Sequence, residues 1–440
     1  MGRRGAAGLC GLVLAGCFNP AAGGGSTGTT GAATGEASAA TGTSGGVTPT
    51  GEASAPSEAS AATTVATGET TTTTSETSAP TSETSTPTRD TSTGELRATF
   101  TMAFELPVTG ASSLAVGDFN GAGGLDLAVG SPSPANLRVL VVFDGDVGKQ
   151  SELDSGEVKS MAAVDLDGPD GDTKDDLIVV QNGTPAAIGV YRNQVDGLST
   201  TASLDGLGGC TAPTQVALGR INGDTFVDAV VVCADVIDGV VYVPGAQGGW
   251  SPSTSVMLGG PFVTAGLADV YEPESIAGLD LVALVGAGVA VFPGQGDGTY
   301  DLDNALSYDQ SGAIRLALGA IDDDAWDDWV VIDPLAGECE VTLGGPAAPT
   351  QLGAHACGET AEDVQLAHVD ADQFVDLVTL HIDRINISAG RGDGTFDAPH
   401  EVPIAGVVVE RLAVADLDGD GRADLAYTGD GKVAVYLQDG

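Results

Sequence analysis

One pattern of apolar and polar positions recurs along the chain from about residue 96 to the end. A short apolar run is followed by an acidic loop of about nine residues, and a second apolar run begins just after an aspartate. The clearest copy spans residues 412–427, with its acidic loop at 416–424. Short apolar runs bounded by turn residues predict β-strands, so each copy predicts two neighbouring strands joined by an acidic loop.

The pattern occurs seven times at nearly constant spacing. Its first loop position falls at Asp118, Asp165, Arg220, Asp269, Ala320, His368 and Asp416. The intervals are 47, 55, 49, 51, 48 and 48 residues, and none is wide enough to hide another copy. A period of about 50 residues with four short strands per unit is typical of a β-propeller, and seven units can close a ring. The sequence therefore predicts an all-β fold, a seven-bladed β-propeller over residues 96–440.

The two ends of the repeat region predict how the ring closes. The chain ends on a single strand at 432–437, so the last unit lacks an outer strand. Residues 98–108 precede the first loop and parallel residues 396–404, the outer-strand segment before the seventh loop. We expect this N-terminal strand to complete the last blade, because pairing there would remove two open sheet edges.

The repeated motifs also resemble a known family. The motif Asp-x-Asp-Gly-Asp-Gly-x-x-Asp-Leu, with GQGDGTY at 294–300 and GRGDGTF at 390–396, resembles the FG-GAP/VCBS repeat, which includes the head of integrin α subunits. The resemblance covers about 345 of the 440 residues and all seven units. It implies the propeller fold. It does not imply one function, because this fold hosts both adhesion proteins and enzymes.

The acidic loops have the donor spacing of a calcium site. Calcium takes six to eight oxygen ligands, and alternate positions of a tight loop direct their side chains at a common centre. Positions one, three, five and nine would supply carboxylates and position seven a backbone carbonyl. The last loop fits in full, with expected ligands Asp416, Asp418, Asp420, the Arg422 carbonyl and Asp424. Its four carboxylates would repel one another without a cation, which favours Ca²⁺ over a solvated turn.

The other loops keep fewer donors. The first loop keeps Asp118, Asn120, Gly124 at position seven and Asp126, but has Ala122 at position five. The second loop is three residues longer, and its expected ligands are Asp165, Asp167, Asp170 or Asp172, and Asp176. Weaker candidates follow a non-acidic first position: Asp322, Asp324 and Asp328 after Ala320, and Asp370, Asp372 and Asp376 after His368.

Two loops are expected to lack the metal. In the third, Arg220 precedes Asn222, Asp224 and Asp228, so we expect an internal salt bridge in place of the ion. The fourth, which contains Tyr271 and Pro273, has lost most of its donors.

The first 95 residues carry targeting signals rather than the repeat. Arg3 and Arg4 precede a short apolar stretch, and Leu-Ala-Gly-Cys at 14–17 resembles the lipobox of bacterial lipoproteins. This resemblance implies a signal peptide at 1–16 and a lipid anchor on Cys17. An ordinary signal peptide is the alternative. Phe18 after the cysteine favours the outer membrane, and the Ser, Thr, Gly and Ala-rich segment 17–95 is typical of a disordered tether.

Four cysteines fall in two local pairs in the repeat region. Export would permit disulfides, and we expect Cys210 to bond Cys233 and Cys339 to bond Cys357. Four cysteines allow three connectivities. A zinc site is the alternative, but no Cys-x-x-Cys spacing supports it.

Charge and scattered reactive residues narrow the function classes. With 16 Lys and Arg against 61 Asp and Glu, the net charge is −45, which argues against binding nucleic acid. The four histidines are scattered, and no Gly-x-Ser-x-Gly motif is present. The acidic pairs at 175–176 and 327–328 are candidates for glycosidase carboxylates, although each has a place in the repeat.

Two further motifs have competing interpretations. Trp250, Trp326 and Trp329 could form a sugar-stacking surface or pack between blades. Arg-Gly-Asp at 391–393 spells an integrin-binding tripeptide, but Gln-Gly-Asp at 295–297 occupies the equivalent place, so Gly-Asp belongs to the repeat.

The sequence thus predicts a monomeric, lipid-anchored propeller at the bacterial outer membrane, facing the cell surface or the periplasm. Calcium would stabilise it, and its loops would bind an extracellular protein or glycan. A carbohydrate-active enzyme on the same ring and a purely structural envelope protein are the two alternatives.

Overall fold

The computed structural model describes residues 98–439, with gaps at 122–123, 134, 144–145, 167–173, 195–196, 208, 235–238, 247–248, 251–253, 257–261, 272–277, 287, 371 and 407. Every regular element among these residues is a β-strand, as predicted. Within them, no helix has the length and apolar character needed to cross a membrane. The predicted signal peptide at 1–16, lipidated Cys17 and tether at 17–95 lie outside the described residues.

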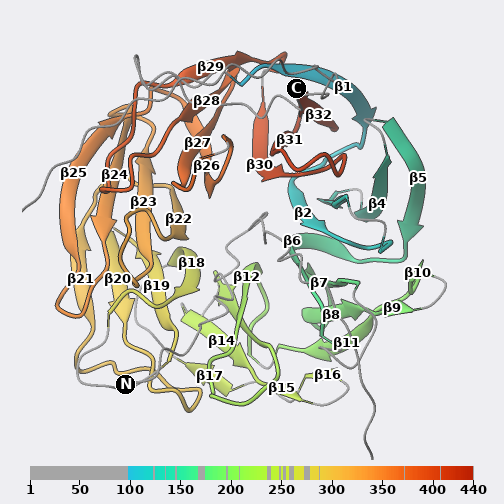
Figure 1. The fold of residues 1–440 in the computed structure, drawn as a ribbon. Helices are drawn as coiled ribbons and strands as arrows, with labels where there is room; N and C mark the ends of the chain where they lie inside the picture. The colour runs from blue at the N-terminus through green and yellow to red at the C-terminus, as the bar shows by residue number, and fades with distance from the viewer. Residues whose placement is uncertain are drawn as a thin grey trace, which may run out of the picture. The chain divides into compact units, whose positions relative to one another are not determined.

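Seven four-stranded antiparallel sheets in the described part of the chain form the blades of a ring (Figure 1). Blade 1 contains β2 (Ser113–Gly117), β3 (Asp126–Pro132), β4 (Ala135–Phe143) and β5 (Asp146–Leu153). Blade 2 contains β6 (Glu157–Val164), β7 (Asp176–Asn182), β8 (Ala187–Tyr191) and β11 (Ser203–Gly206). Blade 3 contains β12 (Pro213–Gly219), β13 (Asp228–Cys233), β14 (Gly239–Val243) and β17 (Thr254–Val256). Two short hairpins extend blades 2 and 3: β9 (Asn193–Gln194) with β10 (Gly197–Leu198), and β15 (Gly245–Ala246) with β16 (Gly249–Trp250).

The remaining four blades complete the ring. Blade 4 contains β18 (Phe262–Ala268), β19 (Asp280–Val285), β20 (Gly288–Phe292) and β21 (Leu306–Asp309). Blade 5 contains β22 (Arg315–Gly319), β23 (Asp328–Asp333), β24 (Glu338–Leu343) and β25 (Thr350–Ala356). Blade 6 contains β26 (Ala361–Ala367), β27 (Asp376–His381), β28 (Arg384–Ser388) and β29 (His400–Pro403). Blade 7 contains β30 (Val409–Ala415), β31 (Asp424–Gly429), β32 (Lys432–Gln438) and β1 (Phe100–Pro107).

The hydrophobic core lies between adjacent blades. One cluster of buried side chains joins Leu114 and Leu127 of blade 1 to Val433 and Val435 of blade 7. The inner strands are buried on both faces, which is why they read as continuous apolar runs instead of alternating ones. The outer strand β25 is mostly exposed. No blade can therefore bury its faces without both neighbours.

The predicted ring closure is confirmed. β1 pairs antiparallel with β32, from Phe100 opposite Gln438 to Pro107 opposite Lys432. In Figure 1, the blue N-terminal strand lies beside the red C-terminal one. Blade 7 is thus assembled from both ends of the repeat region.

Both predicted disulfides are also confirmed. Cys210 bonds Cys233 at the end of β13, and Cys339 on β24 bonds Cys357, each with a Cα–Cα distance of 5.8 Å. Because these four sulfurs are bonded in two pairs, the zinc alternative is excluded.

Candidate metal centre

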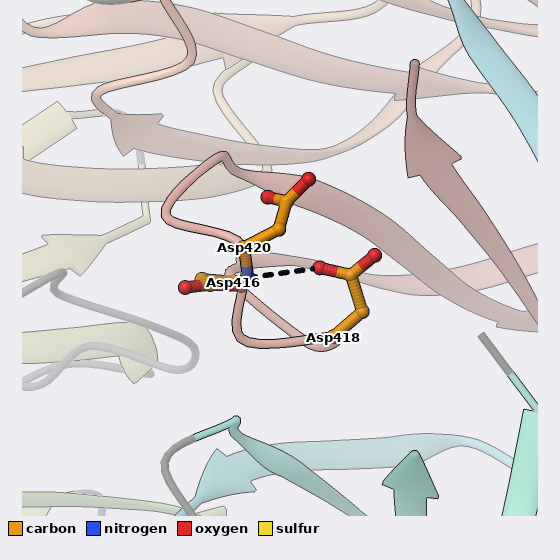
Figure 2. A group of neighbouring side chains, drawn as sticks. All are labelled: Asp416, Asp418 and Asp420. Carbon is orange, nitrogen blue, oxygen red and sulfur yellow. Dashed lines mark hydrogen bonds between the residues drawn. The ribbon is translucent and has the colours of Figure 1, made fainter. Parts of the chain in front are cut away.

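The loop between β30 and β31 brings three carboxylates together. One oxygen each from Asp416, Asp418 and Asp420 can be chosen so that all three lie within 4.8 Å of one another, and this is the single such group among the described residues. Asp416 is buried, Asp418 half-buried and Asp420 exposed. Figure 2 shows the three side chains on one tight turn, where the backbone N–H of Asp420 donates to Asp418 Oδ1 at 3.1 Å.

Hydrogen bonds to the backbone shape this loop. Asp418 Oδ1 accepts the backbone N–H of Asp420, and Asp420 Oδ1 accepts the backbone N–H of Arg422 at 2.9 Å. Each of these bonds to the N–H two residues later closes an Asx turn. The Asp416 carboxylate accepts N–H groups from Gly419 at 2.7 Å and Gly421 at 2.9 Å. Both glycines have left-handed φ values, 80° and 87°, which favour glycine.

The charges of the loop suit a cation. Burial raises the pKa of Asp416 and of Asp418, and the nearby Asp420 charge raises both further. Around the loop the Arg422 guanidinium forms an ion pair with Asp420. The three clustered carboxylates are hard oxygen donors, the ligand type that Ca²⁺ prefers.

Asp424 has a different role from the other three. Its Oδ2 accepts the N–H of Leu417 at 2.8 Å and its Oδ1 that of Gln438 at 2.9 Å. Burial raises the pKa of Asp424 to about 7. It lies outside the cluster of three, so its assignment as a ligand remains a prediction.

The ninth-position aspartate makes the same bond in all seven blades. In each, its Oδ2 accepts the backbone N–H of loop position two: Asp126 from Phe119, Asp176 from Leu166, Asp228 from Ile221, Asp280 from Val270, Asp328 from Ile321, Asp376 from Val369 and Asp424 from Leu417. In blades 2 to 7 its Oδ1 accepts a second N–H at the end of the third strand, from Asn193, Gly245, Gly294, Gly344, Gly390 and Gln438. This buried aspartate therefore ties the loop to the blade with or without metal donors nearby.

The loops of blades 5 and 6 share the two turns but not the first carboxylate. Asp322 and Asp324 accept N–H groups at 3.0 and 2.7 Å, and Asp370 and Asp372 do so at 2.9 and 2.7 Å. In blade 6, His368 Nδ1 donates to the Phe374 carbonyl at 2.9 Å. That carbonyl is at position seven, so the imidazole takes up the acceptor that a calcium ion would need.

One prediction about blade 3 is wrong. Arg220 is exposed and pairs with none of the acidic side chains that the structure describes. Asn222 and Asp224 instead close the same two turns on the N–H groups of Asp224 and Phe226, at 3.0 and 2.7 Å. The hydrogen bonds of the turn replace the expected salt bridge.

Blade 1 keeps part of a site. Asn120 Nδ2 donates to both oxygens of Asp126, at 2.8 and 2.7 Å, and Asp118 Oδ1 accepts the Gly121 N–H at 2.6 Å. The Asn120 Oδ1 is buried and has no hydrogen-bond donor among the described residues. Gly124 packs against the backbone of the blade 7 loop. Ala122 lies outside the described residues.

The candidate site of blade 2 is only partly described. Asp167, Asp170 and Asp172 lie outside the described residues, while Asp165 is half-buried. Asp176 Oδ2 forms an ion pair with Arg192 at 3.0 Å. A guanidinium therefore already compensates that carboxylate. In blade 4, Pro273 also lies outside the described residues.

The proposed catalytic pairs serve the fold. Besides the ninth-position ties of Asp176 and Asp328, Asp175 accepts the Asp118 N–H at 2.9 Å and Asp327 the Asp269 N–H at 3.0 Å. Burial raises the pKa of Asp175 to about 6. Since all four carboxylates hold backbone groups within or between blades, neither pair is arranged as an acid and a free nucleophile.

The tryptophans and the Arg-Gly-Asp sequence also make contacts within the fold. Trp329 is fully buried, with its Nε1 donating to Gln310 at 3.2 Å, and Trp250 is buried as well, so they offer no stacking surface. Arg391 of the Arg-Gly-Asp sequence donates through Nε to Asp397 at 2.7 Å. Asp393 accepts the Thr395 N–H at 3.1 Å within its own turn.

Comparisons with known proteins address the fold. The family described as FG-GAP-like repeat matches residues 368–427, from the acidic loop of blade 6 into β31. The ring is an FG-GAP repeat β-propeller. Among solved structures, BBS1N in complex with ARL6DN is similar to the FG-GAP propeller at 12% identity and a TM-score of 0.53, covering 78% of this chain and 98% of that one.

A second solved structure is an Agrocybe aegerita lectin that recognises non-reducing terminal N-acetylglucosamine. It is 18% identical with a TM-score of 0.48, and the match covers 76% of this chain and 91% of that one. At 12% identity, the similarity to BBS1N concerns the fold alone. No curated protein matches the chain.

Proposed function

We propose that the FG-GAP propeller is a calcium-stabilised binding module whose principal metal site is the blade 7 loop. The observation that carries this is the convergence of Asp416, Asp418 and Asp420 within 4.8 Å. Calcium would be held by these carboxylates with the Arg422 carbonyl. A bound cation would offset the repulsion among these carboxylates. This repulsion adds to burial in raising the pKa of Asp416 and Asp418.

The location of this loop suggests what the ion does. The Leu125 N–H of blade 1 donates to the Asp416 carbonyl at 3.0 Å, so the loop lies at the junction between the last blade and the first. Calcium there would fix that junction and the loops beside it. A rigid set of loops binds a partner with less ordering cost than a mobile set.

A matched pair of substitutions tests the metal site. Asp420 and Asp224 both occupy position five, and both accept the N–H of position seven, at 2.9 and 2.7 Å. With exported modules typically binding calcium at a Kd of about 10⁻⁴–10⁻³ M, we expect a few millimolar calcium to raise the Tm of the wild type. Asp420→Asn should abolish the rise and Asp224→Asn should keep it. An equal response in all three proteins would contradict the proposal.

The proposed partner is an extracellular protein or glycan. The net charge of −45 favours neutral or cationic ligands over anionic polymers. We expect binding on a glycan or surface-protein array that weakens in chelator and in Asp420→Asn, without turnover. Release of reducing sugar would support the enzyme alternative instead, and no ligand at all would leave a structural envelope role.

We further propose a lipid anchor on Cys17 in the bacterial outer membrane, with the protein acting as a monomer. The Leu-Ala-Gly-Cys sequence at 14–17 supports the anchor. Cys17→Ala should move the protein from the membrane fraction to the soluble fraction. Unchanged membrane association in that variant would argue against lipidation.

A further inference from the structure

The innermost strands share one polar position around the centre of the ring. In each blade, the last residue of the innermost strand pairs with the ninth-position aspartate of the next strand. Counting back four residues gives one residue per blade: Ser113, Ser160, Gln215, Thr264, Arg315, Asp363 and Arg411. All seven are polar, and all seven line one pocket of about 100 Å³. We call this set the channel ring.

In several blades the channel ring joins neighbouring blades. Ser160 Oγ accepts the Val216 N–H at 3.2 Å, Gln215 Oε1 the Ala265 N–H at 3.0 Å, and Asp363 Oδ2 the Leu412 N–H at 2.9 Å. Each donor is the residue that follows the ring residue of the next blade. In these three blades, the position accepts a hydrogen bond from the backbone of the next blade.

Arg315 and Arg411 cannot do the same, because a guanidinium cannot accept. Lys159, beside Ser160, lines the same pocket. Of the 16 Lys and Arg residues in the chain, four precede residue 98, which leaves 12 in the propeller, and three of these 12 meet here. Their three positive charges exceed the one negative charge of Asp363 by two, in a protein whose net charge is −45.

Charges beside the pocket offset part of this excess. Arg315 Nε lies 3.6 Å from Asp363 Oδ1, so one guanidinium is partly compensated. Burial lowers the pKa of Arg315, and the nearby charge of Arg411 lowers it further. Glu362 and Glu410 act in the opposite direction on Arg315, but neither lines the pocket.

Several polar groups on the wall lack an acceptor. Gln215 is 5% exposed, and its Oε1 accepts from both Thr264 Oγ1 at 2.7 Å and Ala265 N, which fixes the amide. Its Nε2 then has no hydrogen-bond partner among the described residues, and neither has Ser113 Oγ, on a side chain 1% exposed. Arg315 Nε has its ion pair with Asp363 but no hydrogen bond among these residues. Buried donors are rarely left without an acceptor, so the pocket offers donors to something absent from the protein itself.

We propose that this pocket binds a small oxyanion with one or two negative charges, held by Arg315 and Arg411 with Lys159, Gln215 and Ser113 as further donors. Guanidinium groups match the geometry of carboxylate, sulfate and phosphate oxygens. A volume of about 100 Å³ admits such an ion but not a nucleotide or an oligosaccharide. This site goes beyond the proposed function, because it lies in the pocket lined by the channel ring and not in the calcium loop. The ion would bridge blades that meet only through their neighbours.

Sulfate binding to the full-length protein tests the proposal. Sulfate is titrated calorimetrically into calcium-loaded protein against chloride of equal ionic strength, with acetate and phosphate as further arms. We expect saturable binding of one ion, tighter for the dianions than for acetate because the pocket excess is +2. Arg411→Gln and Lys159→Gln should each weaken the affinity at least tenfold. Arg138→Gln on β4, which removes one charge outside the pocket, should leave it unchanged.

The competing outcomes are distinct. A Tm that rises with sulfate without saturation, equally in wild type and Arg411→Gln, would show a general salt effect and overturn the proposal. Lys159 lines the pocket and forms no ion pair with another described residue, so Lys159→Gln remains informative if Arg411→Gln does not fold. Asp363→Asn keeps an acceptor for the Leu412 N–H while removing a competing charge, and it should tighten sulfate binding several-fold. Weaker binding in that folded variant would also contradict the site.

Discussion

The acidic loops of blades 7 and 3 share part of their internal hydrogen bonding but differ in their first residue. Both carry two successive Asx turns, a left-handed glycine at position four, with φ of 80° and 74°, and a ninth-position aspartate bonded to position two at 2.8 Å. Blade 7 begins with the buried Asp416, whereas blade 3 begins with the exposed Arg220. The acids that the two loops share thus stabilise the turn itself, and we propose that the first position decides whether a cation can bind.

The largest expected effect separates the structural acid from the metal ligands. Asp228→Ala in blade 3 and Asp424→Ala in blade 7 each leave two or more buried N–H groups without an acceptor. We expect each to lower the free energy of unfolding by about 4 kcal/mol in chelator. Urea unfolding without calcium measures this. A large loss for Asp424→Ala that appears only with calcium would mean that Asp424 acts chiefly as a ligand.

The disulfide of blade 3 has no counterpart in blade 7. Cys210 and Cys233 are 23 residues apart, so the double variant Cys210→Ser with Cys233→Ser should lose about 3 kcal/mol in the chain-entropy model. The loss should be the same with and without calcium, as measured by thermal unfolding under non-reducing conditions. A calcium-dependent loss would indicate that the two blades are coupled.

The comparison between blades 7 and 3 can also be tested by creating a calcium site in blade 3. Arg220→Asp places a carboxylate at the first position of the blade 3 loop, as in blade 7, while Asn222 still stands where blade 7 has Asp418. We expect a second calcium to bind, adding about 1.4 kcal/mol of stability at a calcium concentration ten times the Kd. Calorimetry should show the stoichiometry rise by one. An unchanged stoichiometry in the folded variant would show that Asn222 cannot replace Asp418.

The smallest expected effect concerns a buried histidine of blade 6, through which low pH should lower stability independently of calcium. His381 is fully buried, donates from Nδ1 to Glu359 O at 3.0 Å, and accepts at Nε2 from Asn386 at 3.2 Å. Burial lowers the pKa of His381 in the folded protein below its ordinary value of about 6.5. The unfolded chain therefore binds the proton more tightly than the folded protein does, and protonation below a pH of about 6.5 favours unfolding. Stability should therefore fall slightly as the pH drops below that value, and be independent of this group above it. Urea unfolding of the wild type and His381→Asn in chelator would test this. An equal slope in both proteins would assign the effect to other groups.

Much of the fold follows from the sequence because it depends on a regular period. Seven acidic loops fixed the number of blades, the unmatched strand at 432–437 indicated the closure by 98–108, and the local cysteine pairs proved correct. The role of the ninth aspartate could not be read in the same way. Its spacing is identical whether its oxygens accept from backbone N–H groups or bind an ion.

The channel ring was missed for a related reason. Its members share a place in the fold, four residues before the end of the innermost strand, but they include Ser, Gln, Thr, Arg and Asp. No linear motif joins them. The one available signal was a polar residue at the same place in every innermost strand, which becomes meaningful only when the strands surround a common axis.

The pairing of β1 with β32 has a mechanical consequence. The segment that precedes residue 98 enters the ring through Phe100, the first residue of the strand that completes blade 7. A pull on that segment would load the backbone bonds of β1 one after another, starting opposite Gln438, before it reached any other blade. The closure strand would then release first, and β32 would become an open sheet edge in the blade that carries Asp416, Asp418 and Asp420.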